Sequence, residues 1–99
     1  MVTLSVTRYR IANVLNRAAD IVTVDGWYPA RRPVMRAIDA AAGFIPGNGS
    51  PDAEDTTLQA FDALATHLQC PVGTWERIPG LTAGDVAQAL REAARAVTG

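Results

Sequence analysis

Between residues 11 and 22, apolar side chains recur at steps of three and four, and this spacing constrains the fold more than any other feature. At about 100° per residue, they fall within one stripe roughly 120° wide, as in a helix that buries a single face. Thr7 or Ser5 is suited to cap the start of this helix, and Gly26 is placed where a left-handed C-cap is expected. The stripe comprises Ile11, Val14, Leu15, Ala18, Ile21 and Val22.

Three later segments show the same helical spacing. A second helix is expected over residues 33–43, with a proline suited to its first turn and a glycine at its end. A third is expected over residues 52–69, with acidic side chains in its first turn. Thr82, followed three residues later by Asp85, forms a capping-box pattern that begins the fourth. The predicted buried faces are Val34, Ala37, Ile38, Ala41 and Ala42; Leu58, Phe61, Leu64, Ala65 and Leu68; and Val86, Ala87, Leu90, Ala93, Ala94 and Val97.

These segments predict an all-α fold, a single compact domain over residues 1–99 in which four helices pack around one core. Two ordered connections, after the first helix and before the last, complete the bundle. Residues 1–6 have strand-like character and are expected to form an extended or frayed tail. Residues 44–51 contain two prolines and three glycine or asparagine turn formers, which predicts a flexible loop.

The sequence predicts a cytoplasmic protein that does not span a membrane. No apolar run approaches the roughly 20 residues that span a bilayer, and the first ten residues do not resemble a secretory signal. Cys70 is the single cysteine, so no internal disulfide can form, which fits a reducing compartment.

The residues needed for catalysis or metal binding are scarce. His67 is the single histidine and is expected on the solvated side of its helix, while Cys70 is expected to be a small buried apolar residue. A thiolate–imidazole pair between them is the alternative. A metal site needs three or four closely spaced ligands, and the glycine-rich stretch at 47–50 lacks the lysine of a phosphate loop. We therefore predict no catalytic residues, no metal site and no cofactor.

Charge is distributed unevenly along the chain. Residues 1–49 carry six arginines and three acids, giving +3, whereas residues 50–99 carry three arginines and seven acids, giving −4; the sum is the net charge of −1. Every basic side chain is arginine, whose planar guanidinium suits carboxylates, phosphates and aromatic rings. The two halves can pair within the fold or between two copies, although an exposed ion pair contributes only about 0–1 kcal/mol.

The connection "VDGWYPARRP" at residues 24–33 concentrates aromatic and basic side chains. One interpretation is that Trp27, like Trp75 in the later connection, fills one mouth of an alanine-rich core. The other is that the connection is an exposed binding surface, because Trp, Tyr and Arg dominate protein-binding hot spots. On the second interpretation, the partner-binding residues are Trp27, Tyr28, Arg31, Arg32 and Arg36.

These observations favour a small non-enzymatic module that binds another protein, with a homodimer as one form of that idea. The alternative is a nucleic-acid-associated protein in which Arg31, Arg32 and Arg36 contact phosphates. The slightly acidic net charge disfavours nucleic-acid binding. Asp39 also lies three residues after Arg36, where it can pair with that guanidinium.

Three segments resemble a small domain family of actinobacteria and their bacteriophages whose function is unknown. They are "VLNRAADIVTVDGW" at 14–27, "RAIDAAAG" at 36–43 and "WERIPGLTAGDVAQALREAA" at 75–94. The most specific parts are the Gly-Trp after the first helix and the Trp-x-x-x-Pro-Gly-x-Thr before the last. The resemblance implies a cytoplasmic actinobacterial or phage setting and a phage-encoded modulator of a host protein, and it supplies no catalytic residues.

Overall fold

The computed structural model describes residues 2–45, 47 and 50–98, and these residues form five helices. Four are long: α1 (Val2–Asp25), α2 (Val34–Ala42), α3 (Pro51–Leu68) and α5 (Ala83–Thr98). The predicted all-α fold with four main helices is therefore confirmed. The fifth helix, α4 (Val72–Trp75), is a single turn that lies within the connection between α3 and α5.

The start of α1 differs from the prediction. The helix begins at Val2, so residues 2–6 are helical rather than an extended or frayed tail, while Met1 lies outside the described residues. Valine and threonine have only a weak preference against helix. Since neither glycine nor proline interrupts residues 2–25, an established helix can extend towards the N-terminus at little cost.

The other helix ends described below lie at residue types that commonly cap helices: glycine, serine and threonine. Gly43 ends α2 with φ of 75°, and its N–H donates to the carbonyl of Ala40. Ser50 caps α3, accepting a hydrogen bond from the Ala53 N–H at 3.1 Å. Before α5, the Thr82 N–H donates to Asp85 Oδ2 at 3.0 Å, and the Asp85 N–H donates to Thr82 Oγ1 at 3.1 Å, which confirms the capping box.

The predicted flexible loop at 44–51 falls partly outside the described structure, which does not include residues 46, 48 and 49. Its last residue, Pro51, belongs to α3 as the first helical residue. A proline suits this position because the missing N–H would have no partner within the helix.

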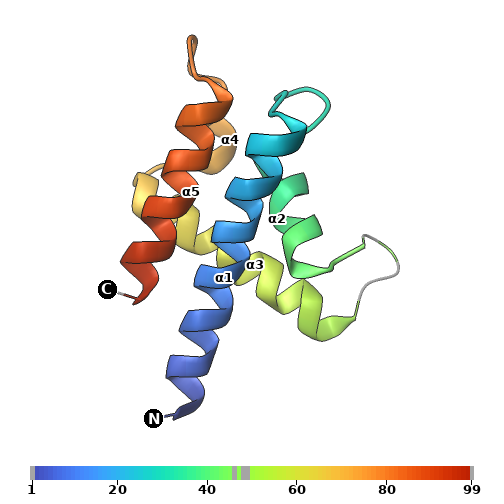
Figure 1. Ribbon diagram of the computed structural model, residues 1–99, viewed down its shortest axis with the longest axis vertical. Coiled ribbons are helices and arrows are strands. Elements are labelled where there is room, and N and C mark those ends of the chain that lie inside the picture. The colour runs from blue at the N-terminus through green and yellow to red at the C-terminus, as the bar shows by residue number, and fades with distance from the viewer. Residues whose placement is uncertain (1, 46, 48–49, 99) are drawn as a thin grey trace.

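Figure 1 shows α1 and α5 running antiparallel beside each other, with α2 on the other side of α1 and α3 crossing behind. The interface between α1 and α5 is the most extensive of the pairs. The end of α1, the start of α2, the α4 turn and the start of α5 all lie at one end of the molecule (Figure 1). The connections that carry Trp27 and Trp75 are therefore neighbours.

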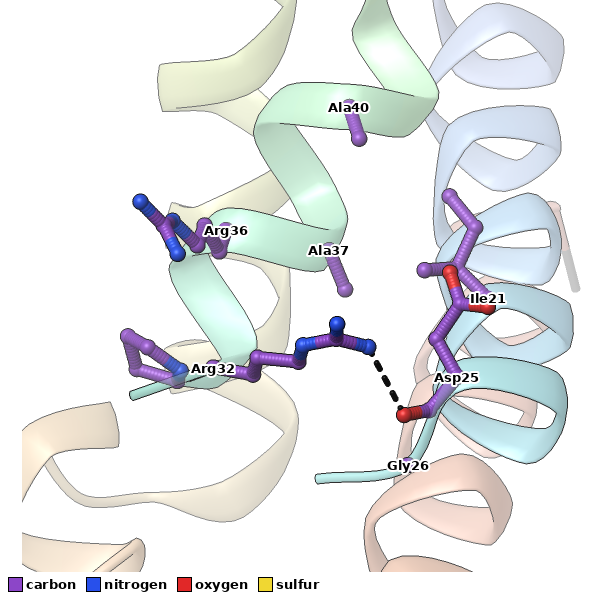
Figure 2. Close-up of a pocket in the computed structure, with 8 residues that line it drawn as sticks. Ile21, Asp25, Gly26, Arg32, Arg36, Ala37 and Ala40 are labelled. Carbon is purple, nitrogen blue, oxygen red and sulfur yellow. Dashed lines mark hydrogen bonds between the residues drawn. The ribbon is translucent and has the colours of Figure 1, made fainter. Parts of the chain in front are cut away.

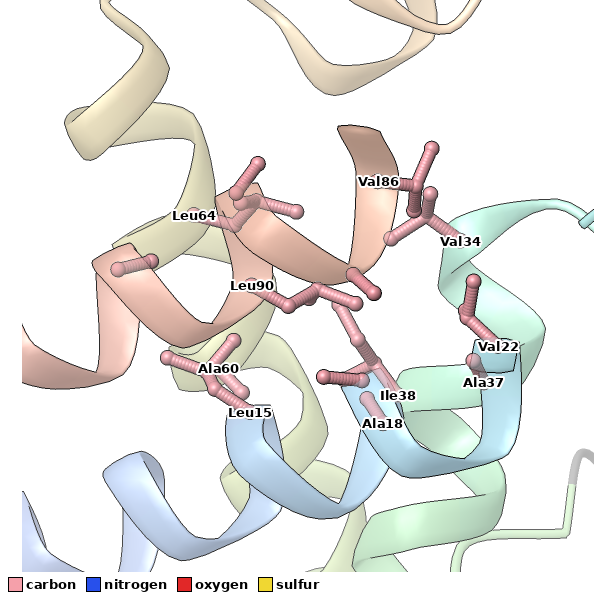
Figure 3. Packing of buried hydrophobic residues seen from close by; sticks show 14 of the residues in the cluster. Leu15, Ala18, Val22, Val34, Ala37, Ile38, Ala60, Leu64, Val86 and Leu90 are labelled. Carbon is pink, nitrogen blue, oxygen red and sulfur yellow. The ribbon is translucent and has the colours of Figure 1, made fainter. Parts of the chain in front are cut away.

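The core lies between the four long helices, and alanines let them approach closely (Figure 3). The predicted faces of α1, α2 and α5 are all buried or partly buried. The largest fully buried side chains are Leu15, Ile38, Leu64, Leu90, Val22, Val34, Val72 and Val86.

The predicted face of α3 was wrong at Leu58, whose side chain is 58% exposed. The helix instead buries Thr56 and Thr57. Their hydroxyls can be buried because each has an acceptor: Thr56 donates to the Asp52 carbonyl at 2.9 Å, and Thr57 donates to Asp39 Oδ1 at 2.6 Å. With these threonines facing the core, Leu58 faces the surface.

Candidate functional site

The connection between α1 and α2 is a closed backbone loop. Gly26 ends α1 with φ of 89°, and its N–H donates to the Val22 carbonyl at 2.9 Å. The Tyr28 carbonyl then accepts hydrogen bonds from the N–H groups of Arg31 at 3.0 Å and Arg32 at 2.6 Å. The Tyr28 N–H donates back to the Arg32 carbonyl at 3.3 Å. The backbone of residues 28–32 is therefore tied to itself.

Trp27 lies beneath this loop and belongs to the core, with only 9% of its surface exposed. Its indole Nε1–H donates to Glu76 Oε2 at 2.9 Å. Trp75 is buried to the same extent. Of the two interpretations of these tryptophans, the structure shows the core plug, and the expectation of an exposed Trp27 anchor was wrong. The indole is buried because the later connection supplies an acceptor for its N–H.

Glu76, which accepts the hydrogen bond of the Trp27 indole, was not predicted from the sequence to have a role in this site. Its Oε2 atom also accepts the Val34 N–H at 2.9 Å, one of the donors at the start of α2 that have no partner within the helix. A carboxylate at a helix N-terminus is further stabilised by the helix dipole. Because Glu76 is at the end of α4, one side chain joins α4, Trp27 and the start of α2.

The outer side of the connection carries the remaining predicted residues. Tyr28 is 58% exposed, and Arg31, Arg32 and Arg36 are all exposed. We call these four residues the basic surface. They border two adjoining hollows, one of about 270 Å³ between α1 and α2 and one of about 520 Å³ beside the loop. The Arg32 side chain contributes to both hollows.

Figure 2 shows how the first hollow is built: Ile21 faces Ala37 and Ala40 across it, and Arg32 reaches over its floor towards α1. The Arg32 guanidinium donates to the Asp25 carbonyl at 2.9 Å, so it caps the C-terminal end of α1. Arg36 also lines this hollow.

The guanidinium groups of the basic surface form no ion pair with any described residue. Arg36 donates to the Arg31 carbonyl at 3.1 Å rather than to Asp39, so the predicted Arg36–Asp39 pair was wrong. The Asp39 carboxylate instead accepts a hydrogen bond from the hydroxyl of Thr57 in α3. By contrast, Arg10 and Arg91 are each paired with a carboxylate.

A family model matches residues 6–96, which is nearly the whole chain. This protein belongs to the family of unknown function DUF6197. No curated protein and no solved structure matches the chain. The small family of unknown function expected from the sequence is thus confirmed.

The groups with catalytic or metal-binding chemistry are dispersed in this DUF6197 protein. His67 Nε2 lies 3.8 Å from Glu92 Oε1 at the surface, and Cys70 is partly buried. Within residues 2–45, 47 and 50–98, no three His, Cys, Asp or Glu side chains are placed to hold a metal ion. In the same residues, no helix has the length and apolar character needed to cross a bilayer.

Replacing Gly26 tests how the basic surface is positioned in this family member. A Cβ atom at Gly26 would lie 2.9 Å from Tyr28 Cε2, and its φ of 89° is unfavourable for alanine. We expect Gly26→Ala to destabilise the protein by about 1–2 kcal/mol and to displace the tyrosine ring. Chemical denaturation measures the first effect. Gly84→Ala is the matched control: Gly84 lies in α5 with ordinary space around it, so a neutral or stabilising change is expected.

Proposed function

We propose that this protein binds another protein through the basic surface, and that the partner presents carboxylates. The observation that carries the proposal is the grouping, around the half-exposed ring of Tyr28, of three guanidiniums that have no carboxylate partner among the described residues. Tyr and Arg are enriched among residues that contribute most to protein binding. Carboxylates are the protein groups that a guanidinium recognises with two parallel hydrogen bonds.

The backbone beneath these side chains supports the same proposal. Residues 28–32 are tied by three backbone hydrogen bonds, and Glu76 anchors the adjoining Trp27 and Val34. A surface that is already ordered loses less conformational entropy on binding than a mobile loop does. The buried Trp27 therefore supports the surface from below and does not contact the partner.

Phosphates are the alternative ligand for the same guanidiniums. The net charge of −1 and the pI of about 5.6 argue against nucleic acid as the main partner. Binding to heparin or duplex DNA that weakens steeply with added salt is the result that favours this alternative. The actinobacterial or bacteriophage setting, the cytoplasmic location and a role in modulating a host protein are parts of the proposal that rest on the resemblance.

The test is quantitative capture from an actinobacterial lysate with three forms of the protein. Arg31→Glu/Arg36→Glu reverses two charges of the basic surface and leaves the Arg32 cap of α1 in place. Arg8→Glu/Arg95→Glu makes the same charge change at exposed arginines in the N-terminal part of α1 and the last turn of α5. These two helix ends lie away from the end of the molecule that carries the connection between α1 and α2 (Figure 1). We expect at least about a tenfold loss of partner with the first variant and wild-type recovery with the second. Equal recovery by all three forms contradicts the proposal.

A further inference from the structure

A largely apolar groove lies on the surface of α3, beside the α4 turn. It has a volume of about 560 Å³ and is lined chiefly by Leu58, Phe61, Ala65, Pro71 and Val72, with Asp62 at its edge. Leu58 is 58% exposed although it is a large apolar residue. We call this feature the α3 groove.

Acidic side chains accompany the groove along the same helix. Glu54, Asp55 and Asp62 are exposed, and within the described residues none of them forms an ion pair. Asp55 and Asp62 are seven residues apart, about two helical turns, so they lie on one side of α3. Gln59, which lies between them and also lines the groove, donates weakly to Asp55 at 3.5 Å.

The α3 groove and the basic surface are complementary in both charge and polarity. One has an apolar hollow beside three carboxylates, and the other has an exposed aromatic ring beside three guanidiniums. In the part of the chain that the structure describes, none of these six charged groups forms an ion pair. The basic surface holds three of the six arginines of residues 1–49, and three of the seven acids of residues 50–99 accompany the groove.

We propose that the α3 groove receives the basic surface of a second copy of this chain. Tyr28 of one copy enters the groove of the other against Leu58 and Phe61, while Arg31 and Arg36 meet Asp55 and Asp62. This inference rests on the proposed function, because it uses the basic surface as a protein-binding surface and identifies its partner. Desolvation of the ring supplies affinity, and the charges set the orientation.

The two contacting surfaces are different, so the interface is heterologous. Each pair of copies leaves one basic surface and one groove unoccupied, unless the rotation between copies closes a ring. The assembly is therefore expected to grow with concentration beyond the dimer or to stop at a closed ring.

Sedimentation of the purified full chain at low salt tests this inference from about 10 μM to about 1 mM, the range of weak interfaces. Wild type is expected to associate, and less so at high salt. Arg31→Glu/Arg36→Glu and Asp55→Arg/Asp62→Arg are each expected to weaken association at least about tenfold. Mixing the two variants restores association, because the unchanged basic surface of one variant then meets the unchanged groove of the other, and the two reversed surfaces also complement each other. Arg8→Glu/Arg95→Glu should associate like wild type.

Helical circular dichroism of each variant verifies the fold, and Asp55→Asn/Asp62→Asn removes the acidic charges without reversing them should the reversed variant not fold. A wild type that stays monomeric across the range overturns the inference, and so does a mixture that fails to associate. If wild type is monomeric while reversal of the basic surface abolishes partner capture, the second-copy inference falls and the proposed function stands. If wild type associates, and reversal of the basic surface changes neither this association nor partner capture, the second-copy inference and the proposed function both fall.

Discussion

Leu90→Ala is expected to lower the free energy of unfolding by about 2–5 kcal/mol, the range for truncating a buried leucine. Leu90 is fully buried in the cluster shown in Figure 3. Nearly half of the buried residues of this cluster are alanines, whose short side chains have little freedom to move into a cavity. A domain of this size is stable by only about 5–15 kcal/mol, so the loss is a large share of the total.

Chemical denaturation measures this change, and the thermal midpoint should fall by roughly 10 °C or more. Leu58→Ala is the matched control, since it makes the same truncation at a leucine that is 58% exposed. At a protein concentration low enough to keep the chain monomeric, the control is expected to change stability by no more than about 0.5 kcal/mol. Equal losses from the two substitutions would mean that α3 buries the face containing Leu58.

Glu76→Ala is expected to destabilise the protein by about 2–4 kcal/mol, although the side chain is only partly buried. The substitution removes the acceptor of two donors at once, the indole N–H of Trp27 and the backbone N–H of Val34. Each of these donors lies in a buried residue, and an unsatisfied buried donor costs about 1–3 kcal/mol.

Tryptophan fluorescence and chemical denaturation together measure the Glu76 effect. Glu76→Gln keeps an oxygen acceptor without the charge, so a smaller loss of about 0.5–1.5 kcal/mol is expected. Glu92→Ala, at a carboxylate whose ion-pair partner is His67 at 3.8 Å, serves as the control and is expected to change stability by less than about 1 kcal/mol. If Glu76→Ala matched Glu92→Ala, Glu76 would not be the anchor of the connection.

The helices could be predicted where an apolar stripe and a cap agree. The stripe from Ile11 to Val22 that ends at Gly26 is one case, Thr82 with Asp85 before α5 is another, and the structure confirms both. The cap expected at Thr7 or Ser5 was wrong, because α1 begins at Val2.

On α3, the predicted Phe61, Leu64, Ala65 and Leu68 are buried or partly buried, but the burial of threonines in place of Leu58 could not be predicted. Thr57 is buried only because Asp39, eighteen residues earlier, accepts its hydroxyl hydrogen bond. Hydrophobic periodicity carries no information about such a pairing.

The candidate site likewise has a part that could be predicted from the sequence and a part that could not. The exposure of Tyr28, Arg31, Arg32 and Arg36 agrees with the second interpretation of the connection, an exposed surface, which fails only at Trp27. The burial of Trp27 depends on Glu76, which is forty-nine residues away in the chain. Both residues lie outside the long helices, so no helical spacing relates them. Only the three-dimensional path of the later connection brings the carboxylate to the indole.

We propose above all that the basic surface held by Trp27 and Glu76 is where this protein binds another protein. Backbone amide chemical shifts of the ¹⁵N-labelled chain, recorded as a captured partner or a second copy is added, test this claim most directly. The largest shifts are expected at residues 28–36. If those amides stayed unchanged while shifts appeared near Arg8 and Arg95, in the N-terminal part of α1 and the last turn of α5, the claim would be contradicted.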